Sequence, residues 1–194
     1  MKIYRFHWDL DRYAPWTRDD GVVNRIADQL PFGTPAAPSW EPPAGHIRDI
    51  AGHQRGDFPF WVDPVFSQRA REALAELCDP CGEWLPLQSP LPEVYFVFNV
   101  LSVVDCIDHT GSRFRRFPDG RVWAATRLAF HPGSLPPEIH CFRVPDMVSG
   151  DFYVTDTFVA AVGDAGLRGL APVELWDSEA GALPIDLLTG RTPA

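Results

Sequence analysis

Residues 94–104 form a long, mostly apolar run, and Asp105, Cys106 and Asp108 follow it closely. The run is rich in Val, Phe and Tyr, which favours a strand buried on both faces over a half-exposed strand. Carboxylates at the end of a buried strand are costly unless they find hydrogen-bond donors. We therefore expect these acids to cap a turn, bind a partner or lie at the surface.

Two segments share one pattern, a short aromatic or β-branched strand followed by a helix. Residues 60–66 (Phe-Trp-Val-Asp-Pro-Val-Phe) match residues 152–158 (Phe-Tyr-Val-Thr-Asp-Thr-Phe). Asp63 and Thr155 are equivalent and are good N-caps, and Pro64 suits the first helical position. The first helix is expected to end near Cys78 and the second near residue 165. Strands at 83–87 and 172–176 would complete two strand–helix–strand units, by duplication or by chance.

Residues 113–127 predict a β-hairpin, because Pro118-Asp119-Gly120 lies between two alternating runs. Five arginines and one aspartate give this hairpin a net charge of +4, and we expect the arginines to lie on its solvent face. Further strands are expected at 127–130 and 141–144. The fold class is therefore α+β, with a mixed or antiparallel sheet, two strand–helix–strand units and one hairpin.

Residues 1–57 are harder to interpret, because aromatic side chains alternate with charges and a Pro/Gly-rich connection occupies residues 31–45. One short helix is expected there, at about 20–30. We divide the chain into an N-terminal segment, 1–57, packed on an α+β domain, 58–194. A hydrophobic fraction of 45% over 194 residues is ample for one core.

The chain carries 17 basic and 26 acidic side chains, a net charge of −9. This charge disfavours nucleic-acid and anionic-membrane partners, which need a basic surface, and it suits a basic protein partner. Much of the acidic excess lies in residues 138–194, which contain nine acidic residues and three arginines. No apolar stretch reaches the ~18 residues of a membrane helix, and no signal h-region opens the sequence. We expect a soluble, cytoplasmic protein. The sequence does not indicate its oligomeric state.

Motifs for metal, cofactor or nucleotide chemistry are sparse. Cys78 and Cys81 form a lone CxxC without a second CxxC or a paired histidine, and it closes a helix, whereas a redox pair opens one. Phosphate-binding glycine loops, HExxH and a nucleophile elbow are absent from the sequence. We therefore expect no metal and no cofactor. Nucleic-acid binding by the arginine hairpin, whose aromatic residues suit base stacking, is an alternative that the charge of −9 disfavours.

Residues 105–109 place acid, thiol, acid and imidazole side by side. In an extended chain, Asp105 and His109 share one side, and Cys106 and Asp108 share the other. A Cys–His nucleophile is therefore not formed locally. We expect no catalytic residue here: the two carboxylates would accept backbone N–H groups and Cys106 would pack as a small hydrophobe. A small enzyme that uses Asp105, Cys106 and Asp108 is the alternative.

An ordered set of segments resembles the bacterial immunity-protein family Imm11, the former DUF1629 group, over about 62–176. Asn99, Asp105, Cys106 and Asp108 stand in a block like the family's Tyr-Tyr-Leu-Leu-Asn-Val…Val-Asp-Cys-Leu-Asp. Thr155-Asp156 stands where the family usually has Ser-Asp. The other matching elements are the segment 62–74 with Ser67 and Arg69, 84–87, Ser112, 141–145, 152–158, 165–170 and 174–176.

The resemblance implies an antidote role, because family members are proposed to lie beside toxin genes and to neutralise the toxin by binding it. No catalytic residues come with the family, so Asn99, Asp105, Cys106 and Asp108 are expected to be structural. The expected function is binding and neutralising a cognate toxin in the bacterial cytoplasm. A ligand-binding or scaffold domain is the alternative. The sequence does not indicate which surface binds, and Trp8, Trp16 and Trp40 are candidate anchors.

Overall fold

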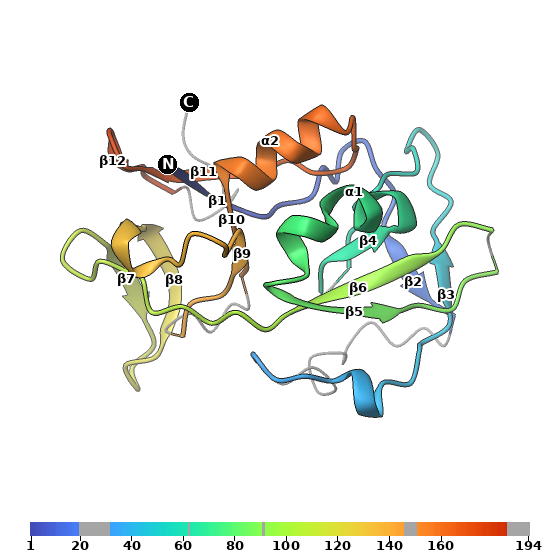
Figure 1. Ribbon diagram of the computed structural model, residues 1–194, viewed down its shortest axis with the longest axis horizontal. Coiled ribbons are helices and arrows are strands. Elements are labelled where there is room, and N and C mark those ends of the chain that lie inside the picture. Colours follow the sequence, from blue (N-terminus) through green and yellow to red (C-terminus); the bar gives the residue numbers. More distant parts are fainter. Residues whose placement is uncertain (20–31, 62, 91, 146–150, 186–194) are drawn as a thin grey trace.

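The computed structural model describes residues 1–19, 32–61, 63–90, 92–145 and 151–185 (Figure 1). The helix expected at about 20–30 lies outside these residues. Two α-helices, two 3-10 helices and twelve strands are present within them. In chain order they are β1 (Lys2–Arg5), β2 (Trp16–Arg18), η1 (Ala37–Ser39), β3 (Gly45–Ile47), β4 (Val65–Ser67), α1 (Gln68–Cys78), β5 (Gly82–Pro86), β6 (Tyr95–Val100), β7 (Arg113–Arg116), β8 (Val122–Arg127), η2 (Pro132–Ser134), β9 (Cys141–Phe142), β10 (Tyr153–Thr155), α2 (Asp156–Asp164), β11 (Val173–Asp177) and β12 (Gly181–Ala182).

The strands form four antiparallel sheets, which confirms the α+β fold class. The largest sheet has the order β12-β11-β1-β10-β9, so the first strand of the chain lies at its centre. Ile3 in β1 faces Thr155 of β10 on one side and Trp176 of β11 on the other. A three-stranded sheet, β4-β6-β5, and two strand pairs, β2-β3 and β7-β8, complete the set.

β6 is buried along its whole length, as its mostly apolar sequence predicts. It pairs with β4 on one side and β5 on the other. Its side chains pack into two different cores, because successive residues of a strand point to opposite faces of the sheet. Phe98 belongs to the core beneath the helices, and Val97 belongs to the core shared with the N-terminal segment.

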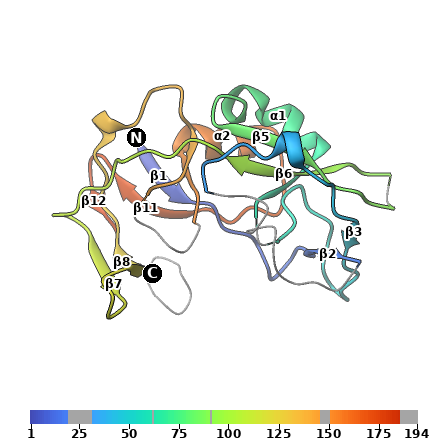
Figure 2. The ribbon, with the colours of Figure 1, turned by 90° about the horizontal axis from the view of Figure 1, so that it is seen from below.

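The two helices lie side by side over one core (Figures 1 and 2). Each follows a short strand directly: α1 follows β4, and α2 follows β10. α1 contributes Ala70, Leu74 and Cys78 to the core, and α2 contributes Phe158 and Val162. Among the described residues, neither helix has the length and apolar character that a bilayer crossing requires.

The expected start of the first helix is wrong by four residues. Ser67 is the N-cap of α1, and its hydroxyl oxygen accepts a hydrogen bond from the Ala70 N–H at 3.1 Å. Asp63 instead lies before β4 and is buried beside Arg143, with 3.6 Å between the Asp63 carboxylate and the guanidinium. The match of 60–66 with 152–158 therefore aligns the wrong residues of the two strand–helix units, because the residue equivalent to Thr155 is Ser67 and not Asp63. Thr155 is the N-cap of α2, as expected.

The prediction that Trp16 is a candidate anchor for a partner is wrong. Only 2% of it is exposed, and its ring packs against Trp61 with centroids 4.6 Å apart. β2 and β3 carry Trp16 and Ile47 onto the sheet β4-β6-β5, where they form a third core with Val65 and Leu85. Trp8 and Trp40 are half-buried, and the Trp40 indole N–H donates to the Pro86 carbonyl oxygen at 2.8 Å.

The expected hairpin is confirmed as β7 and β8. Its turn contains Gly120 with a φ of +88°, a left-handed conformation that favours glycine. Two register shifts interrupt the pairing, one between Arg113 and Phe114 and one between Arg115 and Arg116. Such bulges bend and twist a hairpin. All five arginines of the hairpin are exposed, as expected.

Candidate functional site

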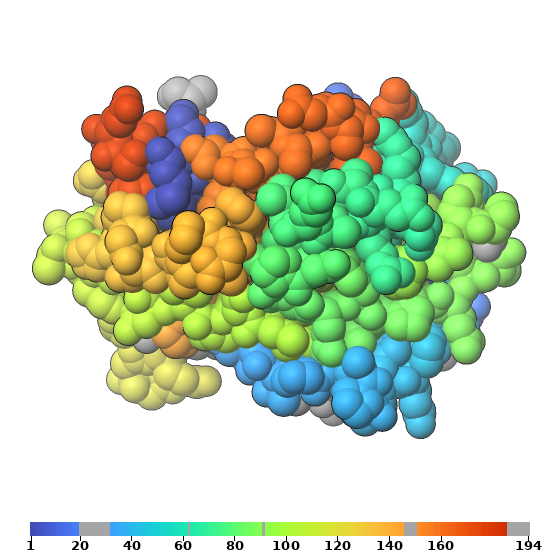
Figure 3. All heavy atoms as spheres, in the orientation of Figure 1, coloured from blue at the N-terminus to red at the C-terminus, as the bar shows by residue number. Residues whose placement is uncertain are grey.

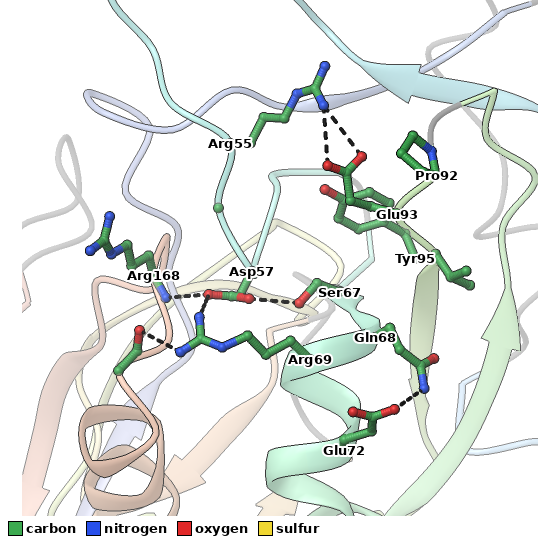
Figure 4. Close-up of a pocket in the computed structure, with 13 residues that line it drawn as sticks. Arg55, Asp57, Ser67, Gln68, Arg69, Glu72, Pro92, Glu93, Tyr95 and Arg168 are labelled. Atoms are coloured by element: carbon green, nitrogen blue, oxygen red, sulfur yellow. Dashed lines mark hydrogen bonds and ion pairs between the residues drawn. The ribbon is translucent and has the colours of Figure 1, made fainter.

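A cleft of about 650 Å³ opens at the N-terminus of α1 (Figure 4). Its walls come from three parts of the chain that are far apart in sequence: residues 55–57, residues 92–95 and the segment after α2, 166–168. The first turn of α1, with Gln68, Arg69 and Glu72, forms the remaining side. The cleft is therefore the place where the N-terminal segment meets both helices.

The floor of the cleft is a carboxylate with three donors. Asp57 is 8% exposed and accepts hydrogen bonds from the Ser67 hydroxyl at 2.8 Å and the Arg69 guanidinium at 3.1 Å. The backbone N–H of Arg168 donates to the same carboxylate at 2.8 Å. Burying a charge is favourable only when it is paired and hydrogen-bonded in this way. Asp57 therefore fixes β4, α1 and the loop after α2 relative to one another.

Arg69 extends this junction to the end of α2. Its second terminal nitrogen donates to the carbonyl oxygens of Ala165 and Gly166 at 2.5 and 3.1 Å. Carbonyls at a helix C-terminus lack intrahelical partners and carry partial negative charge, so a guanidinium there is stabilising. The backbone adds two bonds across the junction, Ser67 N–H to the Asp57 carbonyl oxygen at 2.8 Å and Asp57 N–H to the Arg168 carbonyl oxygen at 2.7 Å.

The rim of the cleft is polar and open to solvent. Arg55 and Glu93 face each other across it at 3.4 Å, and both are about half exposed. Gln68 donates to Glu72 along the helix at 2.5 Å. The exposed side chain of Arg168 points away from the Asp57 carboxylate (Figure 4) and makes no hydrogen bond or ion pair within the described ranges. The arrangement is suited to holding elements together and to polar contacts with a partner.

Sequence reasoning missed Asp57, which lies just before the region of resemblance, although Ser67 and Arg69 were part of that region. The missing signal is tertiary: Asp57 gains its donors from residues 10, 12 and 111 positions away in sequence.

Asn99 lies on β6 and is 3% exposed. Its amide donates to the Thr34 carbonyl oxygen at 3.0 Å and to the Glu83 carboxylate at 2.8 Å. Glu83, on the neighbouring strand β5, accepts in turn from the backbone N–H groups of Ala36 and Ala37 at 2.5 and 3.3 Å. Asn99 and Glu83 therefore tether the segment that enters η1, and Glu83 is a partner that the sequence did not single out.

Asp105, Cys106 and Asp108 do not form one site, because each side chain has different surroundings. Asp105 is exposed, whereas Cys106 is 1% exposed, and burial raises the pKa of its thiol to about 12. A thiol with this pKa is protonated at neutral pH and is a poor nucleophile. Asp108 closes a turn by accepting from the Thr110 N–H, the Thr110 hydroxyl and the Gly111 N–H at 2.8, 2.6 and 3.1 Å.

The turn at Asp108 predicts a pH-dependent effect of Asp108→Asn. Hydrogen bonds from Thr110 and Gly111 hold the pKa of this carboxylate below its ordinary value. A lowered folded-state pKa gives stability that is present above the unfolded pKa of about 3.9 and is lost as the pH falls through the folded value. Asp108→Asn should therefore lower the Tm at neutral pH, and the difference should shrink below about pH 4. Thermal unfolding of both proteins across this pH range checks the trend; a difference that grows on acidification would contradict it.

The CxxC closes α1, as expected, and meets a third cysteine there. Cys78, the last residue of α1, and Cys141 of β9 have sulfur atoms 3.9 Å apart, and both side chains are fully buried. A hydrogen bond from Cys141 lowers the pKa of Cys81 to about 7, while burial raises that of Cys141. In the part of the chain that the structure describes, no three His, Cys, Asp or Glu side chains are placed to hold a metal ion.

Comparison with family models identifies a known family. The model of a family described as an immunity protein family, Imm11, matches residues 65–177, which is more than half of the chain. The matched region begins at β4 and ends at β11, so it includes Ser67, Arg69, Asn99 and Arg168. β1 and Asp57 lie outside it. No curated protein matches the chain.

Proposed function

The chain belongs to the Imm11 family of immunity proteins, and on this premise we propose that it binds a cognate toxin in the bacterial cytoplasm and neutralises it. The observation that carries the proposal is the family match over residues 65–177, which covers both helices and the sheet β4-β6-β5. The unnamed partner is a protein, so the inhibitory surface is expected to be broad, on the order of 800 Å².

Inhibition would be stoichiometric, without chemistry on the toxin. Two features of the described residues support this. The Ser67 hydroxyl is engaged as a helix cap and donates to Asp57, so it is held as a structural group. The thiol of Cys106 is buried and protonated at neutral pH, because burial raises its pKa to about 12.

The net charge of −9 supports a toxin that is basic overall. Opposite net charges accelerate diffusional encounter and favour the correct partner. Part of the acidic C-terminal region is compensated within the molecule, since Lys2 lies 2.9 Å from Glu174 and 3.6 Å from Asp177. Other acids there, including Asp164 and Glu179, are exposed to solvent and contribute to the field.

Growth rescue tests this function. The gene next to that of this protein is expressed alone and together with the protein, against an empty-vector control. The expected result is arrest or death with the neighbour alone and restored growth when both are present. Because inhibition is stoichiometric, rescue should increase with the expression of this protein relative to the toxin. Continued killing in cells that hold the folded protein in excess would overturn the proposal.

A further inference from the structure

The hairpin of residues 113–127, here called the basic arm, projects from the body of the protein (Figures 1 and 3). β7 and β8 form a two-stranded sheet of their own, and at the base of the arm Arg127 bridges Pro184. Val122, beside the turn, and Ala125 are buried in the core, so one face of β8 packs against the body. One face of the arm is therefore fixed on the body, and residues 117–121 at its turn are exposed to solvent.

Two large aromatic side chains lie exposed on the arm. Phe117 and Trp123 are each 43% exposed, and their ring centroids are 6.4 Å apart. Exposed aromatic rings that contact each other beyond the core form a small apolar platform. Trp is among the residues that most often dominate the affinity of protein–protein interfaces, when a partner covers it fully. The platform thus has the composition of an interface centre.

Two arginines of the arm, one of them beside this platform, are held in place by contacts within the arm. The Arg121 guanidinium lies 5.4 Å from the centroid of the Phe117 ring and pairs with Asp119 at 2.8 Å. Arg116 lies 5.5 Å from the centroid of the Phe114 ring and donates to the Gly120 carbonyl oxygen at 2.9 Å. Guanidinium groups that are already positioned lose less conformational entropy on binding. The arm is therefore prepared to meet carboxylates around an apolar centre.

The charge of the arm is opposite to that of the rest of the protein. The arm has five arginines and one aspartate, whereas the rest of the chain carries 12 basic and 25 acidic side chains, a net of −13. From this contrast we propose that the basic arm docks on a compact acidic patch of the toxin. Trp123 and Phe117 fill its apolar centre, and the arginines pair with carboxylates at its edge. The inference rests on the proposed function and identifies the basic arm as the surface that binds the toxin.

A compact patch on a folded protein fits this contrast better than an extended polyanion. Nucleic acid and anionic membranes continue beyond the reach of a single hairpin, and there they would meet the acidic body and be repelled. A local acidic patch touches the arm alone. A toxin that is basic overall, as proposed above, still satisfies this requirement, because steering depends on net charge and docking depends on local charge.

Affinity measurements on matched variants test the inference. The purified product of the neighbouring gene is titrated with wild-type protein, with Trp123→Ala and with Arg115→Glu. Arg115 is exposed and makes no hydrogen bond or ion pair within the described ranges, so its replacement leaves the fold intact. We expect the Kd to rise about 30-fold for Trp123→Ala and about tenfold for Arg115→Glu, with a weaker salt dependence for the second.

The controls are matched in kind. Phe60→Ala removes another aromatic ring that is 40% exposed, and Arg48→Glu makes the same change in net charge at an exposed site off the arm. Both should bind within about twofold of wild type if only the arm contacts the toxin strongly. Equal Tm values establish that all four variants are folded. An arm variant that fails this check is replaced by Arg115→Ala.

The outcomes separate the two proposals. If wild-type protein does not bind the neighbouring gene product, the proposed function fails before the arm is at issue. If wild-type protein binds and the arm variants bind as tightly as the controls, the inference that the arm docks on the toxin is overturned, and the proposed function stands. Loss of self-association, or of binding to an oligonucleotide or an anionic vesicle, in the arm variants with unchanged toxin affinity would assign the arm to a different occupant and overturn the inference.

Discussion

A fragment of residues 58–194 is expected not to fold on its own, because it lacks the central strand of the largest sheet. β10 and β11 do not pair with each other; both pair with β1. Without β1, the inner edges of both strands lose their backbone partners, and unpaired buried N–H and C=O groups are costly. Ile3, only 1% exposed, would also leave a cavity beneath the sheet.

Removing residues 1–57 also removes Phe6 from the core beneath the helices. Its ring stacks on Phe152 at 4.5 Å and contacts Phe58 and Phe66 at 5.7 and 5.9 Å. Circular dichroism of the fragment should show no cooperative thermal transition, whereas the whole chain should melt in one step. The point variant Phe6→Ala, in the whole chain, should lose about 3–5 kcal/mol of unfolding free energy. A fragment that melts cooperatively near the Tm of the whole chain would contradict this account and make 58–194 a unit by itself.

Replacing Asp57 by alanine is expected to lower the unfolding free energy by about 3 kcal/mol or more. The change removes three hydrogen bonds and leaves the Ser67 hydroxyl, the Arg69 guanidinium and the Arg168 N–H without their acceptor. Removing one partner of a buried charged pair costs about 3–5 kcal/mol. Arg69 is about half exposed and water can solvate it, so we place the loss at the lower end. For a chain of this length the Tm should fall by about 6–12 °C.

Glu93→Ala is the matched control for Asp57→Ala. It also removes one carboxylate from the same cleft, but this carboxylate is 46% exposed and contacts Arg55 at 3.4 Å. An exposed ion pair contributes about 0–1 kcal/mol, so the Tm should change by no more than a few degrees. A double-mutant cycle with Arg69→Ala should give a favourable coupling energy for the Asp57–Arg69 pair. Equal effects of the Asp57 and Glu93 substitutions would show that Asp57 is not the centre of the junction.

The parts of the fold that follow from local pattern could be predicted from the sequence. β6 follows from a mostly apolar run, the hairpin of β7 and β8 from Pro118-Asp119-Gly120, and the end of α1 at Cys78 from its apolar periodicity. The start of α1 was misplaced because Asp63-Pro64 is as good a capping sequence as any. The true cap, Ser67, is decided by the pairing of β4 with β6, a tertiary contact.

The candidate site depends on contacts that no local pattern encodes. In the sequence Asp57 is an ordinary acid without a motif, and it gains its role only because Ser67 and the Arg168 backbone converge on it in the fold. Likewise, Cys141 approaches Cys78 although 63 positions separate them. Trp16 was misjudged because aromatic side chains and charges are mixed over residues 1–57, which hides the buried positions. The pairing of β2 with β3 places its ring in the third core. The exposed arginines of the basic arm were predictable, since a hairpin with one buried face must put its charges on the other.

The most direct test of the central claim is titration of the purified toxin, the neighbouring gene product, with this protein while toxin activity is followed. The account predicts that activity falls in proportion to the protein added and vanishes near one equivalent, with a stable complex in size-exclusion chromatography. Full toxin activity in a large excess of folded protein, with the two eluting separately, would contradict it.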